Sequence, residues 1–224
     1  KPASETPLTA LYIVDILERA GVPKGVVNLI LPSNTGPQIS KMLHDPRVRN
    51  LSFTGSTEVG RTLLKESADC VLRTSMELGG NAPFVVLEDA DIEEAVKGAM
   101  IAKMRNGGAA CTAANRFFVA KKIAQEFTDK FVKAMSTLRV APGLEEGAQL
   151  GASVSIKERN KIAELVASSV NSGGELIIGG KTPAGDGAFY PATVIEVKKD
   201  NPILNEEVFG PVAPIVTFES DEEA

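Results

Sequence analysis

Residues 84–119 have the sequence FVVLEDADIEEAVKGAMIAKMRNGGAACTAANRFFV and contain one complete repeat of the pattern on which the fold depends. The apolar runs Phe84-Val85-Val86-Leu87 and Phe117-Phe118-Val119 at its two ends are typical of buried strands. Between these runs the apolar residues follow the i, i+3, i+4 spacing of an amphipathic helix at Ile92, Ala95, Val96, Ala99 and Met100. Asp91, with Glu94 three residues later, fits the N-terminal cap of this helix. The order strand, helix, strand predicts an α/β unit.

The same alternation continues on both sides of this stretch. Upstream, strand-like runs at 26–30 and 50–53 alternate with helix-like runs at 8–19, 36–43 and 57–67, and the helix at 8–19 is apolar enough to predict deep burial. Downstream, helical stripes at 123–135 and 162–170 are followed by strand-like runs at 176–178, 193–195 and 214–218. The whole pattern predicts an α/β fold with parallel strands. Because the paired glycines after Leu78 join two α/β patterns, we predict two domains, residues 1–78 and 79–224.

Composition excludes several classes of protein. The 224 residues carry a net charge of -5 with scattered basic residues, which argues against nucleic-acid binding. No apolar run approaches the roughly 18 to 20 residues that span a bilayer, so we expect no membrane partner. The first residues lack the basic and apolar regions of a signal peptide, and two cysteines do not form a disulfide framework. We therefore expect a cytoplasmic location.

Cys111 is the candidate nucleophile, because small residues at 107–110 precede it and would let a substrate and a flat cofactor ring approach closely. A nucleophilic cysteine needs exposure and thiolate character. The alternative is a buried structural thiol where a loop enters a strand. The single histidine, His44, argues against a Ser-His-Asp triad and against most zinc sites, so we expect no metal.

Three further segments carry candidate site residues. Glu77, between strand-like residues and Gly79-Gly80, would have a raised pKa if partly desolvated, as suits a general base. Ser56 lies in a strand–turn–helix segment, 53–60, whose amides would hold a phosphate, although the segment matches no nucleotide-binding motif. In residues 205–211, a carboxylate from Glu206 or Glu207 would contact ribose hydroxyls, and Phe209 would pack on a ring. The alternatives are a surface glutamate, an ordinary capped turn and an acidic loop.

Taken jointly, these segments resemble the aldehyde dehydrogenase superfamily over essentially the whole chain. The matching segments, in order, are Lys1-Pro2-Ala3-Ser4, Thr6–Leu11, Gly21–Asn28, Phe53–Thr57, Glu77-Leu78-Gly79-Gly80, the Cys111 segment and Glu206–Pro211. The resemblance implies part of a Rossmann-type NAD(P)-binding domain at 1–78 and most of an α/β catalytic domain at 79–224.

The resemblance also implies the chemistry. Cys111 would attack an aldehyde to give a thiohemiacetal, hydride would pass to nicotinamide, and Glu77 would activate water to hydrolyse the thioester. The implied cofactor is NADP or NAD. Lys1 would hold its adenosine ribose and Ser56 its pyrophosphate. Gly79 would line the slot of the nicotinamide ring, Glu207 would hold the nicotinamide ribose, and Phe209 would pack near that ring.

Two departures from the family pattern modify this picture. Many members have Glu where Ser4 stands, and loss of that carboxylate beside Lys1 predicts that NADP is accepted. The usual Gly-Gln before the cysteine is here Gly108-Ala109.

A full-length member is about twice as long, so we expect this chain to be an internal part of such a protein and to form a homo-oligomer only when complete. The family's oxyanion Asn would precede Lys1. Because such a donor contributes roughly 3 kcal/mol, we expect the chain alone to be inactive or nearly so.

The substrate-side segments, among them Cys111–Phe117 and Phe189–Val194, look most like those of succinate-semialdehyde dehydrogenases. An aminoaldehyde or a broad aliphatic aldehyde remains an alternative substrate. An acylating enzyme that passes the thioester to coenzyme A is opposed by Glu77, whose activated water would waste the thioester. A non-catalytic binding protein is opposed by the joint presence of Cys111, Glu77 and Glu207, although for the isolated chain binding without turnover stays open.

Overall fold

The computed structural model describes all 224 residues, which divide into two compact units, Lys1–Leu78 and Gly79–Ala224. The α/β class predicted from the sequence is confirmed, since helices and strands alternate through both units. The cofactor-binding and catalytic roles expected for the two ranges stay predictions.

The first unit is built around one β-α-β element. Strand β1 (Asn50–Thr54) leads through α3 (Thr57–Asp69) to β2 (Arg73–Glu77), and the two strands pair in parallel, with Thr54 opposite Glu77. Helix α2 (Thr35–Leu43) packs on α3, and α1 (Pro7–Arg19) precedes both. Only three residues are fully buried in this unit, namely Leu43, Gly60 and Ser67.

Two predictions for this unit were wrong. The deep burial expected for residues 8–19 is absent, because no other helix or strand of the first unit packs closely on α1, which has no buried residue and leaves Leu8 77% exposed. The strand expected at 26–30 does not form. Gly25 has a left-handed φ of 86°, and the Asn28 side chain donates to the Gly25 carbonyl at 2.8 Å. This local turn satisfies the backbone in place of a strand ladder.

The second unit contains a five-stranded sheet in the order β3-β4-β7-β6-β5. Its strands are β3 (Ala82–Val86), β4 (Ala114–Ala120), β5 (Glu175–Ile178), β6 (Thr193–Glu196) and β7 (Val212–Phe218). All neighbours are parallel except the edge strand β5, which runs antiparallel to β6. The predicted parallel arrangement therefore holds for four of the five strands.

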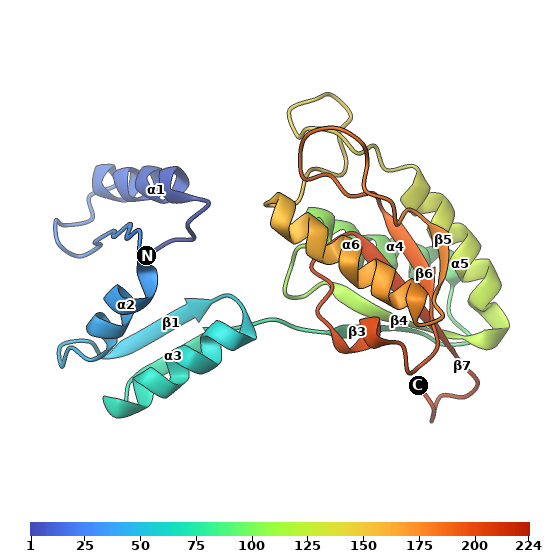
Figure 1. Ribbon diagram of the computed structural model, residues 1–224, viewed down its shortest axis with the longest axis horizontal. Helices are drawn as coiled ribbons and strands as arrows, with labels where there is room; N and C mark the ends of the chain where they lie inside the picture. The colour runs from blue at the N-terminus through green and yellow to red at the C-terminus, as the bar shows by residue number, and fades with distance from the viewer. The chain divides into compact units, whose positions relative to one another are not determined.

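Helices cover both faces of this sheet (Figure 1). On one face lie α4 (Ile92–Met104) and α5 (Lys121–Ser136), and on the other lie α6 (Ile156–Asn171) and the short helix η2 (Pro202–Asn205). Successive strand residues point to opposite faces, so Phe117 and Ile215 pack under α5 while Phe118 and Val216 pack on the α6 side. Because both faces are covered, these strands have apolar residues at successive positions, as at Phe117-Phe118 and Ile215-Val216.

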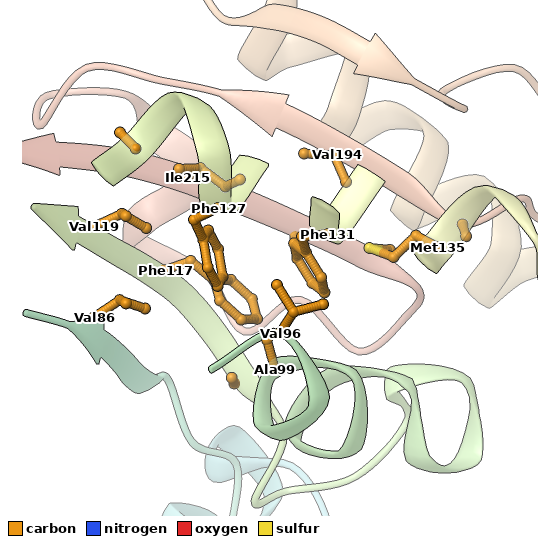
Figure 2. Close-up of a cluster of buried hydrophobic side chains, with 14 of the residues drawn as sticks. Val86, Val96, Ala99, Phe117, Val119, Phe127, Phe131, Met135, Val194 and Ile215 are labelled. Atoms are coloured by element: carbon orange, nitrogen blue, oxygen red, sulfur yellow. The ribbon is translucent and has the colours of Figure 1, made fainter. Parts of the chain in front are cut away.

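The larger core lies between α4, α5 and the sheet. Figure 2 shows Phe117 from β4 reaching Phe127 and Phe131 of α5, with Val96 and Ala99 of α4 beside them. Phe117 and Phe131 are fully buried, with ring centroids 5.3 Å apart. The predicted cap of α4 is confirmed, because the Asp91 carboxylate accepts the Glu94 N–H at 3.1 Å. This packing fixes the end of α4, from which the chain enters the Cys111 loop.

Candidate functional site

Cys111 lies in a loop of unusual backbone between α4 and β4. The short helix η1 (Arg105–Gly108) contains three consecutive left-handed residues, Asn106, Gly107 and Gly108, with φ of 53°, 61° and 76°. The Asn106 side chain donates to the Ala109 carbonyl at 2.8 Å, which holds the only non-glycine of the three in place. Cys111 is exposed and unpaired, as a nucleophile requires. Exposure alone does not single it out, because Cys70 is exposed as well.

The glycine at 108 is required by packing. A Cβ on Gly108 would lie 2.1 Å from the Gly210 carbonyl oxygen, closer than any real contact. The backbone before Cys111 is thus pressed directly against the backbone after Phe209. Close approach of ligands was the reason expected for the glycines at 107 and 108, and at Gly108 the structure provides a different one.

The paired glycines Gly79 and Gly80 bring the Cys111 loop and Glu207 together. A Cβ on Gly80 would lie 2.7 Å from the Cys111 carbonyl oxygen, and one on Gly79 would lie 2.3 Å from a Glu207 carboxylate oxygen. The Gly80 N–H donates to Glu207 Oε1 at 3.0 Å. Three of the predicted site residues, Gly79, Cys111 and Glu207, therefore share one small region of the second unit.

A buried lysine connects the elements of this region. Lys103, in the last turn of α4, is completely buried, and its Nζ donates to Asn115 Oδ1 at 3.1 Å and to the Val208 carbonyl at 3.0 Å. Asn115 Nδ2 in turn donates to the Gly80 carbonyl at 3.0 Å. Burial lowers the pKa of Lys103 to about 7, while the nearby Glu207 carboxylate opposes that shift.

Sequence reasoning missed Lys103, although a signal was present. Val96, Ala99 and Lys103 occupy positions i, i+3 and i+7 of one helix, and all three are buried. A lysine on the apolar face of an amphipathic helix rarely lies in a core without partners. That position alone marked it as a residue with a buried role.

Phe209 borders a cavity. The side chain is 45% exposed and lines a hollow of about 570 Å³, together with Asn106, Gln149, Glu158 and Tyr190. The Tyr190 hydroxyl is buried without a hydrogen-bond partner, and burial raises the pKa of this phenol to about 12. Phe209 therefore offers an exposed aromatic face at this cavity, whereas the Tyr190 hydroxyl is enclosed in the cavity wall.

The other predicted residues belong to the first unit. Ser56 caps α3 by accepting the Val59 N–H at 3.4 Å, and the Gly55 N–H donates to the Glu77 carbonyl at 3.1 Å. The turn that is expected to hold a phosphate and the expected base, Glu77, thus meet at the carboxyl ends of two parallel strands. This is the usual ligand-binding edge of such sheets. Lys1 and Ser4 are exposed and make no side-chain hydrogen bond.

The partial desolvation predicted for Glu77 is not present in the first unit, where the side chain is exposed. The reason lies in the alternation of β2. Thr74 and Met76 are partly buried, whereas Arg73, Ser75 and Glu77 are on the face that stays exposed. The structure also contains no group of three or more His, Cys, Asp or Glu side chains arranged to hold a metal, and none of its helices is both long and apolar enough to cross a membrane.

Comparison with known proteins places this geometry in a family. The model of the family described as "Aldehyde dehydrogenase family" matches residues 1–224. The chain belongs to the aldehyde dehydrogenase family. The succinate-semialdehyde dehydrogenase of Paenarthrobacter nicotinovorans is 48% identical over 100% of this chain and 50% of its own length. The glutarate-semialdehyde dehydrogenase of Pseudomonas aeruginosa is 42% identical over 100% of this chain and 46% of its own length.

A solved structure agrees with these relatives. The crystal structure described as an E. coli NADP dependent enzyme matches with a TM-score of 0.95 and 39% identity, over 99% of this chain and 46% of that chain. This aldehyde dehydrogenase chain therefore spans about half the length of the curated relatives that it matches. Family and fold follow from these matches, and the activity of the whole protein is a matter for proposal.

Proposed function

We propose that this chain is part of an NAD(P)-dependent enzyme that oxidises an aldehyde to a carboxylate through a covalent cysteine intermediate. The observation that carries the proposal is the convergence of the exposed Cys111 loop, Gly79 and Glu207 in a chain that matches the aldehyde dehydrogenase family over its full length.

Cys111 is the proposed nucleophile. Its thiolate adds to the aldehyde carbon to form a thiohemiacetal, and loss of hydride from that carbon leaves a thioester on the sulfur. Exposure of Cys111 supports this role, and the turn in which the Ala113 N–H donates to the Ala110 carbonyl at 3.0 Å holds the thiol at the loop surface. Glu77 is the proposed base that activates water to hydrolyse the thioester. Its exposed carboxylate is free of protein partners, as a water-activating group must be.

The cofactor supplies the hydride acceptor, and the residues of the second unit fit its nicotinamide half. One carboxylate oxygen of Glu207 accepts a hydrogen bond from the Gly80 N–H, and the remaining lone pairs of the carboxylate can accept hydrogen bonds from ribose hydroxyls. Phe209 borders a cavity in which an aromatic amide would find a ring face to pack against. In the first unit, Ser56 at the N-terminus of α3 is the proposed contact for the pyrophosphate, with Lys1 at the adenosine ribose.

NADP is proposed as an accepted cofactor. Lys1 supplies a cation and Ser4 lacks the carboxylate that would repel a 2′-phosphate, and both side chains are exposed. We expect titration calorimetry to give a Kd for NADP that does not rise well above the Kd for NAD. In Ser4→Glu, the Kd for NADP should rise selectively. A wild-type Kd for NADP far above that for NAD would contradict this choice.

Succinate semialdehyde is the proposed substrate, supported by the name of a 48% identical relative. A 42% identical relative is named for glutarate semialdehyde, one methylene longer, so chain length is the distinction to measure. A methylene in a pocket changes specificity by only about 10–200-fold. Rates with succinate semialdehyde, glutarate semialdehyde and an uncharged aliphatic aldehyde should therefore fall in that order.

The cytoplasmic location and the homo-oligomer stay predictions. Two unpaired, exposed cysteines fit a reducing compartment, and light scattering of a complete protein would give its oligomeric state.

The deciding experiment couples turnover to chemistry at the thiol. NADPH formation from succinate semialdehyde is followed for this chain and for the longest natural protein that contains it, beside intact-mass detection of an adduct at Cys111. Cys111→Ala should abolish both signals, whereas Cys70→Ala, which removes the other exposed thiol, should leave both unchanged.

The outcomes of this experiment separate cleanly. We expect the chain alone to form the adduct with little or no turnover. Turnover that survives Cys111→Ala would refute the proposed nucleophile, and turnover by the chain alone at the rate of a full-length enzyme would refute the expected inactivity. An adduct without NADPH, in the longer protein as well, would favour a binding role.

A further inference from the structure

Lys103 is a buried, hydrogen-bonded amine that the proposed chemistry does not use. Its stem passes Gly108, since a Cβ built on that glycine would lie 3.2 Å from Lys103 Cε. Its Nζ then reaches the Val208 carbonyl, which lies between Glu207 and Phe209 in the chain. One side chain therefore touches both the segment before Cys111 and the segment that carries two proposed cofactor contacts.

The same amine is linked to the third segment of the site through one intermediate. Asn115, itself only 2% exposed, accepts from Lys103 Nζ and donates to the Gly80 carbonyl. The N–H of Gly80 is the group that Glu207 holds. A closed chain of contacts runs from Lys103 through Asn115 and Gly80 to Glu207, and back through Val208.

We infer that Lys103 is a positioning residue that holds the Glu207–Phe209 segment against Gly80 and the Cys111 loop. This role rests on the proposed function, because it fixes the residues expected to receive the nicotinamide ribose. Two features make the amine suited to it. A long, unbranched stem reaches from the helix axis to a backbone carbonyl, and two acceptors at 3.0 and 3.1 Å satisfy two donors.

The positioning role of Lys103 does not depend on whether its amine is protonated. Desolvation lowers the pKa of Lys103, and Glu207 is the charged group that acts against that shift. A neutral amine still has two N–H donors for Asn115 and Val208, and an ammonium has a third. Both contacts therefore survive on either side of neutral pH.

The test compares three variants on the 224-residue chain by amide hydrogen exchange and mass spectrometry. Lys103→Met keeps a flexible side chain of similar length and removes the donors. Lys103→Gln restores an N–H₂ group at the same position. Lys97→Met is the matched control, because Lys97 lies on the same helix and makes an exposed pair with Glu94 at 2.6 Å.

We expect Lys103→Met to speed exchange in residues 206–210 about tenfold or more, because it removes a hydrogen bond and leaves the Val208 carbonyl buried without its donor. Exchange in α5, to which Lys103 makes no hydrogen bond, is the internal reference and should stay within about twofold, as should all peptides of Lys97→Met. Lys103→Gln should recover part of the protection.

Equal acceleration in α5 and residues 206–210 would overturn the inference, because it would mean that Lys103 only contributes to global stability. Unchanged exchange in 206–210 would overturn it as well. If Lys103→Met does not fold, Lys103→Gln decides alone. Faster exchange confined to residues 206–210, with α5 unchanged, supports the role, whereas uniform acceleration or unchanged exchange in 206–210 refutes it. Failure of the proposed function would appear instead as absence of a Cys111 adduct, which this measurement does not use.

Discussion

Replacing Gly108 by alanine tests whether the Cys111 loop depends on direct backbone contact with Gly210. A Cβ at position 108 would meet the Gly210 carbonyl oxygen at 2.1 Å and its carbon at 2.6 Å, so the backbone of one segment must move. Overpacking of this kind costs about 1–3 kcal/mol. The left-handed φ of 76° adds about 1–2 kcal/mol for a residue with a Cβ. We expect Gly108→Ala to lower the free energy of unfolding of the second unit by about 2–5 kcal/mol.

Gly173→Ala is the matched control for this substitution. Gly173 also has a left-handed φ, 88°, but a Cβ there would meet nothing within 4 Å. The two variants share the backbone strain and the change in unfolded-chain entropy, so their difference measures the crowding at position 108, which is chiefly the clash with Gly210. That difference should be about 1–3 kcal/mol.

The assay uses urea unfolding with a probe confined to the second unit. The chain has two tyrosines and no tryptophan. In a Tyr12→Phe background the buried Tyr190 is the only tyrosine, and its fluorescence reports the unit that contains Gly108. If Gly108→Ala and Gly173→Ala lie within about 0.5 kcal/mol of each other, the inferred contact does not constrain the loop.

Three further predictions use the same assay. Phe117→Ala removes a fully buried ring from the larger core and should cost about 3–5 kcal/mol, and a loss under about 1 kcal/mol would show that this core is loosely packed. Asp91→Ala removes the N-cap of α4 and should cost about 1 kcal/mol, whereas Asp89→Ala, outside the cap, should be near neutral. The pKa of Lys103 is lowered to about 7 in the folded chain, so above pH 7 the unfolded chain binds more protons than the folded chain. The free energy of unfolding should therefore rise from pH 7 toward 9.5, by at most about 1.4 kcal/mol per pH unit. Lys103→Met should remove that slope, and a slope that persists would assign it to another group.

The strands and helices of the second unit were predictable because the spacing of apolar residues in the sequence matches the faces that are buried in the structure. Strands β4, β6 and β7 each carry consecutive apolar residues, and in β4 Phe117 and Phe118 find partners on opposite sides of the sheet. Helix α5 shows the 3.6-residue stripe at Phe127, Phe131 and Met135, all buried. Local pattern and tertiary environment agree here, and such agreement is what makes a prediction from sequence safe.

The first unit shows where the same reasoning fails. The apolar residues of α1 correctly indicate a helix but not what covers it, and Leu8 is largely exposed in this chain. Residues 26–30 have strand composition, yet strands exist only through pairing, and the bond from Asn28 to the Gly25 carbonyl closes a turn instead. Composition indicates which environment would suit a segment, such as burial or pairing in a sheet. Only the tertiary structure determines whether the segment is buried or paired.

The candidate site divides along the same line. Motif order brought Cys111, Gly79 and Glu207 to attention, because each lies in a short segment with a distinctive sequence. Lys103 lies in no such segment, and its partners are 12 and 105 residues away along the chain. Yet a charged group on the buried face of a helix needs partners, and those partners must come from the loops that close over it. A lysine at a core position of the helix before the Cys111 loop therefore predicts a buried hydrogen bond between that helix and the segments around the loop.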